Sequence, residues 1–267
     1  MQIEGKTALV TGASSGMGAA IARSLAKAGA QVLLLARREE ELNRVAGEIR
    51  SAGGKAMVYP IDLTDSQAVE ALAARITKEI GTPDILVNNA GAGQWKFIEE
   101  TSAEEARQMM AMPYLAAFYV TRAFIPEILK RDSGHIVNIS SVASRFVWPG
   151  ASAYTAARWA VRGFTEALRS DLYGTGIGVT LYESSQVSSP YWERNPGSRE
   201  RIPGIGKILL RTLAPEEVGE AVVEAIRRNK RLIVIPFMLK MVYFQHFFAP
   251  WAVQWLMNAT GYRRPKR

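Results

Sequence analysis

Short, almost continuously apolar runs alternate along the chain with longer segments in which apolar residues recur every three or four positions. The short runs lie at residues 7–10, 31–36, 56–61, 85–88, 135–140, 178–183 and 232–236. Such runs are typical of β-strands that are covered on both faces. The longer segments predict amphipathic helices, at residues 17–28, 39–50, 68–80, 104–129, 153–173 and 215–227.

Alternation of strands and helices favours right-handed crossovers and a doubly wound parallel sheet. The length, 267 residues, suits either one large α/β domain or two small ones. Two stretches interrupt the alternation. Residues 188–213 are rich in Ser, Pro, Gly and Arg and predict a substrate loop. Residues 237–267 form a hydrophobic and basic C-terminal tail.

A glycine-rich turn at residues 11–18 follows the first predicted strand and opens the first predicted helix. In this context Gly12 permits a tight turn, Gly16 lets a phosphate approach the backbone, and Gly18 lets the helix pack closely on the sheet. Free amides at a helix start bind phosphate. The alternative is an ordinary strand-to-helix turn. The candidate nucleotide contacts of this loop are Gly12, Ser14, Ser15, Gly16, Met17 and Gly18.

The end of the second predicted strand indicates which dinucleotide is bound. Sites that select NAD usually place an acidic residue there, to accept hydrogen bonds from the ribose. This chain has Ala36 followed by Arg37 and Arg38, which suit a 2′-phosphate. We therefore expect NADP(H). The alternative is a solvated helix start whose arginines pair with the acids at 39–41.

Composition excludes several kinds of chemistry. The absence of cysteine rules out disulfides, thiolate metal sites and cysteine nucleophiles, and with two histidines no metal site is expected. The formal charge of +8 suits anionic partners such as a nucleotide or lipid head groups. The basic residues are scattered and no nucleic-acid motif accompanies them, so no nucleic-acid partner is expected. No signal-like segment opens the chain, which favours a cytoplasmic protein.

Several motifs in order, from about residue 2 to 236, resemble the short-chain dehydrogenase/reductase family. The turn at 11–18 is similar to its cofactor loop, Asp62-Leu63 to its adenine contacts, and Asn88-Asn89-Ala90-Gly91 to its motif at the fourth strand. The resemblance implies one domain over residues 1–236, a seven-stranded Rossmann-type parallel sheet with helices on both faces, and a homodimer or homotetramer formed through helices 104–129 and 153–173. Nucleotide contacts beyond the glycine loop are then expected at Arg37, Arg38, Asp62, Leu63, Asn89, Ala90, Gly91, Tyr154, Arg158 and Val187.

The resemblance also implies a catalytic set of Ser141, Tyr154 and Arg158. In the family, the tyrosine gives or takes the hydroxyl proton while hydride passes to or from nicotinamide, and the serine orients the substrate oxygen. A free phenol has a pKa near ~10, too high for efficient proton transfer at neutral pH. A cation about 4 Å away, at an effective dielectric of about 20, contributes roughly 4 kcal/mol. Taken alone, a serine at a strand end commonly caps the next element, and a helical tyrosine is commonly core.

Three positions depart from the family pattern. Arg158 replaces a lysine, Pro113 replaces an asparagine that helps hold a water in the proton relay, and Ser184-Ser185 replace Pro-Gly. Proline should also kink its helix. Two hypotheses follow. The first is an NADP(H)-dependent oxidoreductase that interconverts a hydroxyl and a carbonyl group. The second is a nucleotide-binding relative with lost or altered catalysis, acting as a sensor, partner protein or non-redox enzyme.

The predicted substrate pocket is aromatic. It would be lined by the loops at 93–97 and 188–213, with apolar walls from Trp95, Phe146, Trp148, Tyr191 and Trp192. These side chains favour a bulky, lipophilic substrate.

The tail predicts contact with a membrane surface. Residues 237–257 are long enough to span a bilayer, which takes about 20 apolar residues, but Pro250 and several polar residues interrupt them. Read as one helix, the segment places Lys240, His246, Gln254 and Asn258 in a sector about 120° wide. Basic residues flank it: Arg227, Arg228, Lys230 and Arg231 before, Arg263, Arg264, Lys266 and Arg267 after. Peripheral binding to anionic lipid is expected; the alternatives are packing on a subunit, capping of a lipophilic pocket, or ordinary core.

Overall fold

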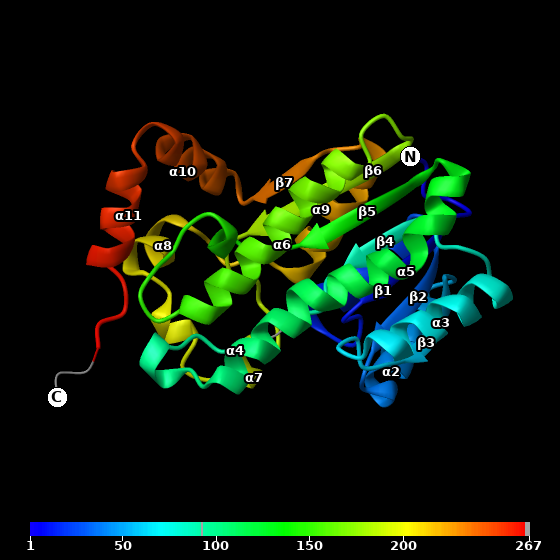
Figure 1. The fold of residues 1–267 in the computed structure, drawn as a ribbon, viewed down its shortest axis with the longest axis horizontal. Coiled ribbons are helices and arrows are strands. Elements are labelled where there is room, and N and C mark those ends of the chain that lie inside the picture. Colours follow the sequence, from blue (N-terminus) through cyan, green and yellow to red (C-terminus); the bar gives the residue numbers. More distant parts are fainter. Residues whose placement is uncertain (92, 265–267) are drawn as a thin grey trace.

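A twisted, fully parallel sheet of seven strands forms the centre of the computed structural model, which describes residues 1–91 and 93–264 (Figure 1). The strands run in the order β3-β2-β1-β4-β5-β6-β7. Their bounds are β1 (Thr7–Thr11), β2 (Gln31–Ala36), β3 (Lys55–Pro60), β4 (Ile85–Asn88), β5 (Gly134–Ile139), β6 (Ile177–Ser184) and β7 (Leu232–Ile235). The predicted doubly wound parallel sheet is confirmed, and each predicted strand overlaps an observed one.

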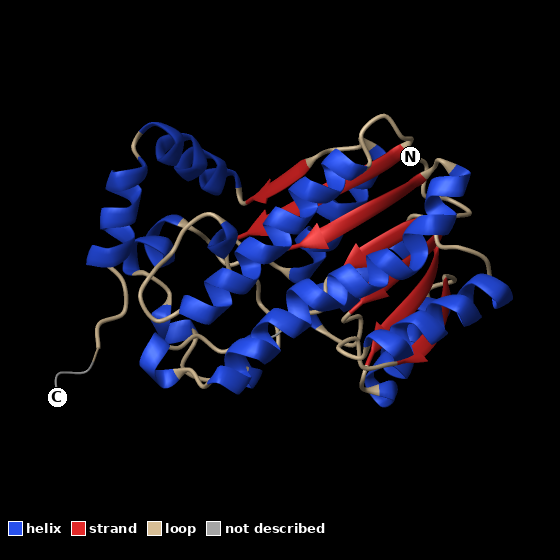
Figure 2. Cartoon of the chain, viewed as in Figure 1, coloured by secondary structure: helices blue, strands red, loops and turns tan. Residues whose placement is uncertain are grey.

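Helices cover both faces of the sheet (Figure 2). One face packs on α1 (Gly16–Lys27), α2 (Glu39–Ser51) and α9 (Pro215–Arg227). The other packs on α3 (Ser66–Glu79), α5 (Ala116–Arg131) and α6 (Ser152–Asp171). The apolar strand residues are therefore buried from both sides, which explains why their sequence runs show no polar alternation.

The strand order reverses at β1, which lies between β2 and β4. Chain crossovers leave β1 in opposite directions, and a crevice opens beyond the carboxyl ends of the strands at this point. The glycine loop follows β1 directly, so the fold places it at the mouth of that crevice.

The prediction of one long α-helix at 104–129 is wrong, because the chain changes conformation around Pro113. The structure has α4 (Ala103–Met110), a π-helical turn at Ala111–Leu115 and α5. Pro113 lies inside the turn and has no amide hydrogen to donate. The Ala116 amide bonds back to the Ala111 carbonyl, five residues earlier, so the wider turn accommodates the proline.

The two segments that interrupt the alternation of strands and helices are both helical in part. The 188–213 loop contains α7 (Tyr191–Arg194), a 3-10 turn at Arg199–Arg201 and α8 (Gly204–Leu209). The tail is two helices, α10 (Phe237–Phe248) and α11 (Pro250–Ala259).

The prediction that the tail forms one continuous helix, from which the polar sector was derived, is therefore wrong. Pro250 starts α11, where its missing amide donor is not needed, and a non-helical Ala249 separates the two helices. Among the described residues no helix is long and apolar enough to cross a membrane. Two of the predicted flanking bases, Lys266 and Arg267, lie outside the described residues.

Candidate active site

The glycine loop between β1 and α1 has the backbone that its sequence requires. Gly12 and Gly16 have φ angles of 65° and 55°, a region that favours glycine. A Cβ on Gly18 would lie 2.2 Å from the Gly12 carbonyl oxygen. The loop is tied to β4 by Thr11, whose Oγ1 accepts hydrogen bonds from the amides of Asn89 and Ala90 at 2.9 and 3.0 Å.

A cleft of about 430 Å³ opens beside this loop. Among the described residues that line it are four arginines and no acidic residue, which makes it a site for an anion with more than one charge. Most of the predicted nucleotide contacts meet here: Gly12, Ser14, Ser15, Gly16, Met17, Gly18, Arg37, Arg38, Leu63, Asn89, Ala90, Gly91 and Arg158.

Three predicted nucleotide contacts lie elsewhere. Tyr154 and Val187 line the adjoining cavity instead. Asp62 lines neither cavity, and its carboxylate accepts hydrogen bonds from the amide and hydroxyl of Thr64 at 3.0 and 2.8 Å. These bonds, with a smaller contribution from Arg37, lower the pKa of Asp62.

The two arginines after β2 lie at the rim of the cleft. Both are exposed, and Arg38 donates a hydrogen bond of 3.3 Å to the Ser14 hydroxyl in the glycine loop. Arg38 also lies 3.9 Å from Glu41, a contact of the kind expected for a solvated helix start. The last residue of β2 is Ala36, so the strand end itself carries no carboxylate.

A fourth arginine of the cleft, Arg194, was missed by sequence reasoning. It lies on α7 and donates a hydrogen bond of 3.1 Å to the Ser15 hydroxyl. Ser189 of the same loop packs on the glycine loop, because a Cβ on Gly16 would lie 3.1 Å from the Ser189 Cβ. The predicted substrate loop therefore covers the nucleotide cleft as well. Its arginine content was the only sequence signal.

The predicted catalytic residues gather in the adjoining cavity, of about 120 Å³. Tyr154 and Arg158 lie one turn apart on α6, and each is 6% exposed. The Arg158 guanidinium carbon lies 5.0 Å from the centre of the Tyr154 ring. Arg158 also lines the nucleotide cleft, so its permanent positive charge stands where the two cavities meet.

The Arg158 guanidinium is held by backbone. Its Nη1 donates to the Ile139 carbonyl at 3.4 Å, and a Cβ on Gly91 would lie 2.9 Å from Nη2. Its Nε has no hydrogen-bond partner among the described residues. A larger residue at position 91 would displace the guanidinium.

Ser141 caps the 3-10 turn Val142–Ser144 that follows β5. Its hydroxyl oxygen accepts a hydrogen bond of 3.2 Å from the Ala143 amide, and the residue lines the cavity that holds Tyr154. The capping role and the predicted substrate-orienting role are thus compatible, because capping fixes the position of the oxygen.

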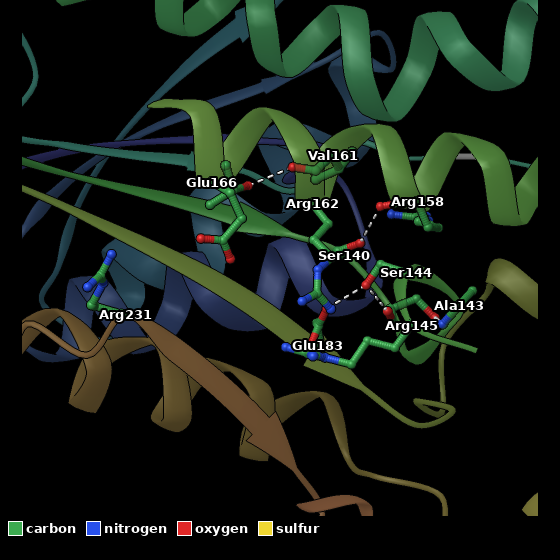
Figure 3. A network of polar contacts seen from close by, with 12 residues as sticks. Ser140, Ala143, Ser144, Arg145, Arg158, Val161, Arg162, Glu166, Glu183 and Arg231 are labelled. Atoms are coloured by element: carbon green, nitrogen blue, oxygen red, sulfur yellow. Dashed lines mark hydrogen bonds and ion pairs between the residues drawn. The ribbon is translucent and has the colours of Figure 1, made fainter. Parts of the chain in front are cut away.

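Glu183 of β6 binds this turn through the side chain of Ser144 (Figure 3). Its carboxylate is fully buried and accepts a hydrogen bond of 2.5 Å from the Ser144 hydroxyl. Arg145 and Arg162 lie 2.9 and 3.5 Å from its two oxygens. The Arg145 guanidinium carbon lies 4.5 Å from the ring centre of Tyr243 on α10. Burial and the negative charge of Glu183 raise the pKa of Tyr243, so the tail contributes a neutral phenol to this cluster.

Aromatic side chains line the cavity that holds the predicted catalytic residues, which we call the catalytic cavity. The Trp95 ring centre lies 5.0 Å from that of Trp148, 5.2 Å from that of Tyr154 and 5.7 Å from that of Trp192. Four of the five predicted walls line the cavity, but Phe146 does not. It packs edge-on against Tyr243 and His246 of α10, because the tail helix lies under it.

Tyr191 was predicted only as a wall, but it is also a polar anchor. Its hydroxyl donates to the Gly93 carbonyl at 2.5 Å and accepts from the Trp95 indole at 3.0 Å. Burial, and then the neighbouring Tyr154, raise its pKa well above the ordinary value of a phenol. Tyr191 therefore stays neutral and fastens the 188–213 loop to the loop after β4.

The other residues that depart from the family pattern, Ser184, Ser185 and Pro113, make contacts within the protein. The Ser184 hydroxyl donates to the Ser185 carbonyl, and the Ser185 hydroxyl donates to the Arg211 carbonyl, both at 3.0 Å. The second bond ties the end of β6 to Arg211 in the 188–213 loop. Pro113 is buried in the π-helical turn, and its neighbour Met112 lines the nucleotide cleft.

Comparison with known proteins agrees with this geometry. Residues 6–197 match the family described as short chain dehydrogenase. A fatty acyl-CoA reductase of Acinetobacter baylyi is 34% identical over 238 residues, covering 86% of this chain and 76% of that protein. A metagenomic short-chain oxidoreductase solved in complex with NADP is 32% identical, with a TM-score of 0.74, covering 88% of this chain and 98% of that one. A short-chain dehydrogenase/reductase of Burkholderia phymatum in complex with NAD has a TM-score of 0.82, covering 99% of this chain and all of that one, and at 24% identity shares the fold.

Proposed function

Because the chain belongs to the short-chain dehydrogenase/reductase family, we propose that it is an NADP(H)-dependent oxidoreductase that interconverts a hydroxyl and a carbonyl group on a lipophilic substrate. The observation that carries the proposal is the position of Arg158. It is buried between the nucleotide cleft and the cavity that holds Ser141 and Tyr154. Residues suited to proton transfer therefore lie next to residues suited to a dinucleotide.

The nicotinamide of the bound cofactor would supply or accept the hydride. Tyr154 would give its phenolic proton to the carbonyl oxygen in reduction and take it back in oxidation. Ser141, fixed by its capping bond, would donate a hydrogen bond to the same oxygen. The Arg158 charge would stabilise the phenolate that this exchange requires, since it is permanent and lies beside the ring. The aromatic walls would exclude water from the reacting atoms.

NADP(H) is proposed over NAD(H) because the rim of the cleft is basic. Arg37 and Arg38 follow an alanine at the end of β2, where a carboxylate would otherwise meet the ribose. The related metagenomic enzyme solved with NADP and the fatty acyl-CoA reductase relative fit, respectively, this cofactor and a lipophilic substrate.

Replacing both rim arginines, Arg37→Ala with Arg38→Ala, should weaken NADPH binding about 100-fold and leave NADH binding almost unchanged. Each charge-assisted hydrogen bond to a phosphate contributes about 1.5–3 kcal/mol, and 1.4 kcal/mol is tenfold in affinity. Titration of cofactor fluorescence measures both constants. Arg44→Ala is the matched control, because Arg44 is an exposed arginine of α2 that does not line the cleft. Equal or tighter binding of NADH by the unchanged protein would rule out the proposed specificity.

We also propose two kinds of partner. A second copy of the chain would pack on the outer faces of α5 and α6, where Phe118 and Trp159 are partly exposed. Phe118 continues into a cluster with Tyr114 and Phe164, whose ring centres lie 6.4 and 5.7 Å from its own. The other partner is a membrane surface at the tail, met peripherally by a cytoplasmic protein.

The function is tested by incubating the protein with NADPH and a panel of aliphatic and aromatic carbonyl compounds. Saturable NADPH binding together with carbonyl-dependent loss of its absorbance is expected, with the highest kcat/KM for the most apolar compounds. Binding with no oxidation across the panel would leave the oxidoreductase proposal without support.

A second candidate is nucleotide binding with lost or altered catalysis, and one observation favours it. Pro113 stands buried where the family has a water-holding asparagine, and a proline side chain makes no hydrogen bond. Under this candidate NADPH still binds, and an Arg158→Lys variant turns over faster than the unchanged protein.

A further inference from the structure

The outer surfaces of α8, α10 and α11 carry a dense group of exposed apolar side chains. We call this group the tail face: Ile208, Leu209, Phe237, Met238, Met241, Phe244, Phe247, Phe248, Trp251, Trp255 and Leu256. The three helices gather at one end of the molecule, beyond the carboxyl ends of β6 and β7 (Figure 1). Exposed apolar surface on this scale marks an interaction site.

The orientation of α10 shows that this exposure is systematic. Its inner side packs into the protein through Leu239 and Val242, while Phe244, Phe247 and Phe248 point outward and are 61–79% exposed. A helix that faces water carries polar residues on its outer side. The outer side of α10 is also mainly apolar, with Lys240 and Gln245 as its exposed polar residues, so it suits an apolar environment with polar groups nearby.

Charge selects an anionic lipid surface as the occupant. The segments at 201–213 and 237–264 contain no acidic residue, whereas Lys207, Lys240 and Arg263 are basic. A second copy packed on this face would bring the same positive charges together. Exposed Phe and Trp beside Lys and Arg are the composition of helices that lie in the head-group region of a bilayer.

A second, small apolar cavity lies next to the catalytic cavity on the side of the tail face. It lies between α8, α10 and α11, and two of its lining residues, Leu209 and Leu256, belong to the tail face. Gly206, Leu210 and Met257 line both this cavity and the catalytic one. Two of the helices that expose apolar residues outward, α8 and α11, therefore also line the catalytic cavity, through Gly206 and Met257.

We propose that the tail face docks the protein on an anionic lipid bilayer, and that a lipid-chain substrate passes from the bilayer between α8 and α11 into the catalytic cavity. The docking stands independently, whereas the passage rests on the proposed function. Docking would bring the opening at Leu209 and Leu256 against the acyl chains, so the substrate would not have to cross water.

The docking is tested with the full chain by flotation on vesicles of phosphatidylcholine, with and without phosphatidylserine. A triple variant, Phe244→Gln, Phe247→Gln and Phe248→Gln, should bind at least about tenfold more weakly, because three exposed rings no longer enter the bilayer. Lys240→Gln should weaken binding about fivefold on the anionic vesicles only. Tyr173→Gln is the control, because Tyr173 is 91% exposed and lies before the amino end of β6, whereas the tail lies beyond its carboxyl end, so this change should have no effect.

Unchanged flotation of the triple variant, with its melting temperature also unchanged, would overturn the docking. A triple variant that instead forms a smaller oligomer, when the parent does not bind vesicles, would overturn it in favour of a second copy.

The passage is tested by comparing a short water-soluble aldehyde with a long-chain aldehyde carried in the vesicles. NADPH gives hydride to the carbonyl carbon and a proton adds to its oxygen in both cases, so only delivery differs. The triple variant should lose about tenfold in rate on the vesicle-borne aldehyde and retain its rate on the soluble one. Equal loss on both would overturn the passage. No turnover of either by the parent protein, with normal flotation, would contradict the proposed function and leave the docking intact.

Discussion

Replacing Tyr154 by phenylalanine is expected to lower kcat for carbonyl reduction by roughly 10²–10⁴-fold, the range of a positioned general acid. The ring would still fill the space against Trp95, 5.2 Å away, so the cavity should keep its shape. NADPH affinity should change little, because Tyr154 lines the catalytic cavity and not the nucleotide cleft. Initial rates at saturating NADPH, together with a binding titration, separate the two effects.

Tyr182→Phe is the matched control for this loss. Tyr182 is a fully buried tyrosine of β6 that lines neither cavity, so removing its hydroxyl should leave kcat unaltered. A Tyr154→Phe protein as fast as its parent would mean that another group moves the proton. Tyr191, whose hydroxyl contacts Gly93 and Trp95, would then be the first residue to examine.

Glu183→Ala should lower the free energy of unfolding by about 3 kcal/mol, the lower end of the range for breaking a buried ion pair. The lower end applies because Arg145 and Arg162 are each one-quarter exposed and can turn toward water. For a domain of this size the melting temperature should fall by roughly 6–12 °C. Activity should fall as well, since Glu183 holds the turn that positions Ser141.

Glu166→Ala provides the comparison. Glu166 also pairs with an arginine, Arg169, but is half exposed, and such surface pairs contribute about 0–1 kcal/mol. Thermal and urea unfolding of both variants would measure the difference. Equal melting temperatures for the two would show that the Glu183 cluster does not stabilise the fold.

The sheet, and the proximity of the predicted catalytic residues, were predictable from sequence for a local reason. Strands buried on both faces are apolar throughout. In the turn after β1, Gly12 and Gly16 have positive φ angles and Gly18 leaves room for the Gly12 carbonyl oxygen, so these requirements arise within the turn itself. Tyr154 and Arg158 are four residues apart on one helix, so their proximity follows from helix geometry alone.

What sequence reasoning missed depends on contacts between distant segments. Arg194 reaches Ser15 across 179 residues, and Tyr191 reaches Gly93 across 98. Phe146 does not line the cavity as predicted; it packs instead on α10, about a hundred residues later in the chain. No local pattern records such pairings. The π-helical turn is different: Pro113 marked the break, but not the conformation that would accommodate it.

The contact between Tyr243 and the Arg145–Glu183 pair bears on how the tail can be studied. A protein shortened at Pro236 would lose the aromatic cover of that cluster and admit water to a carboxylate that is otherwise sealed. If this shortened protein bound liposomes more weakly, the cause could be the disturbed Arg145–Glu183 cluster as much as the loss of a lipid anchor. Point changes on the outward rings of α10 avoid this ambiguity, since they leave the inward-facing phenol in place.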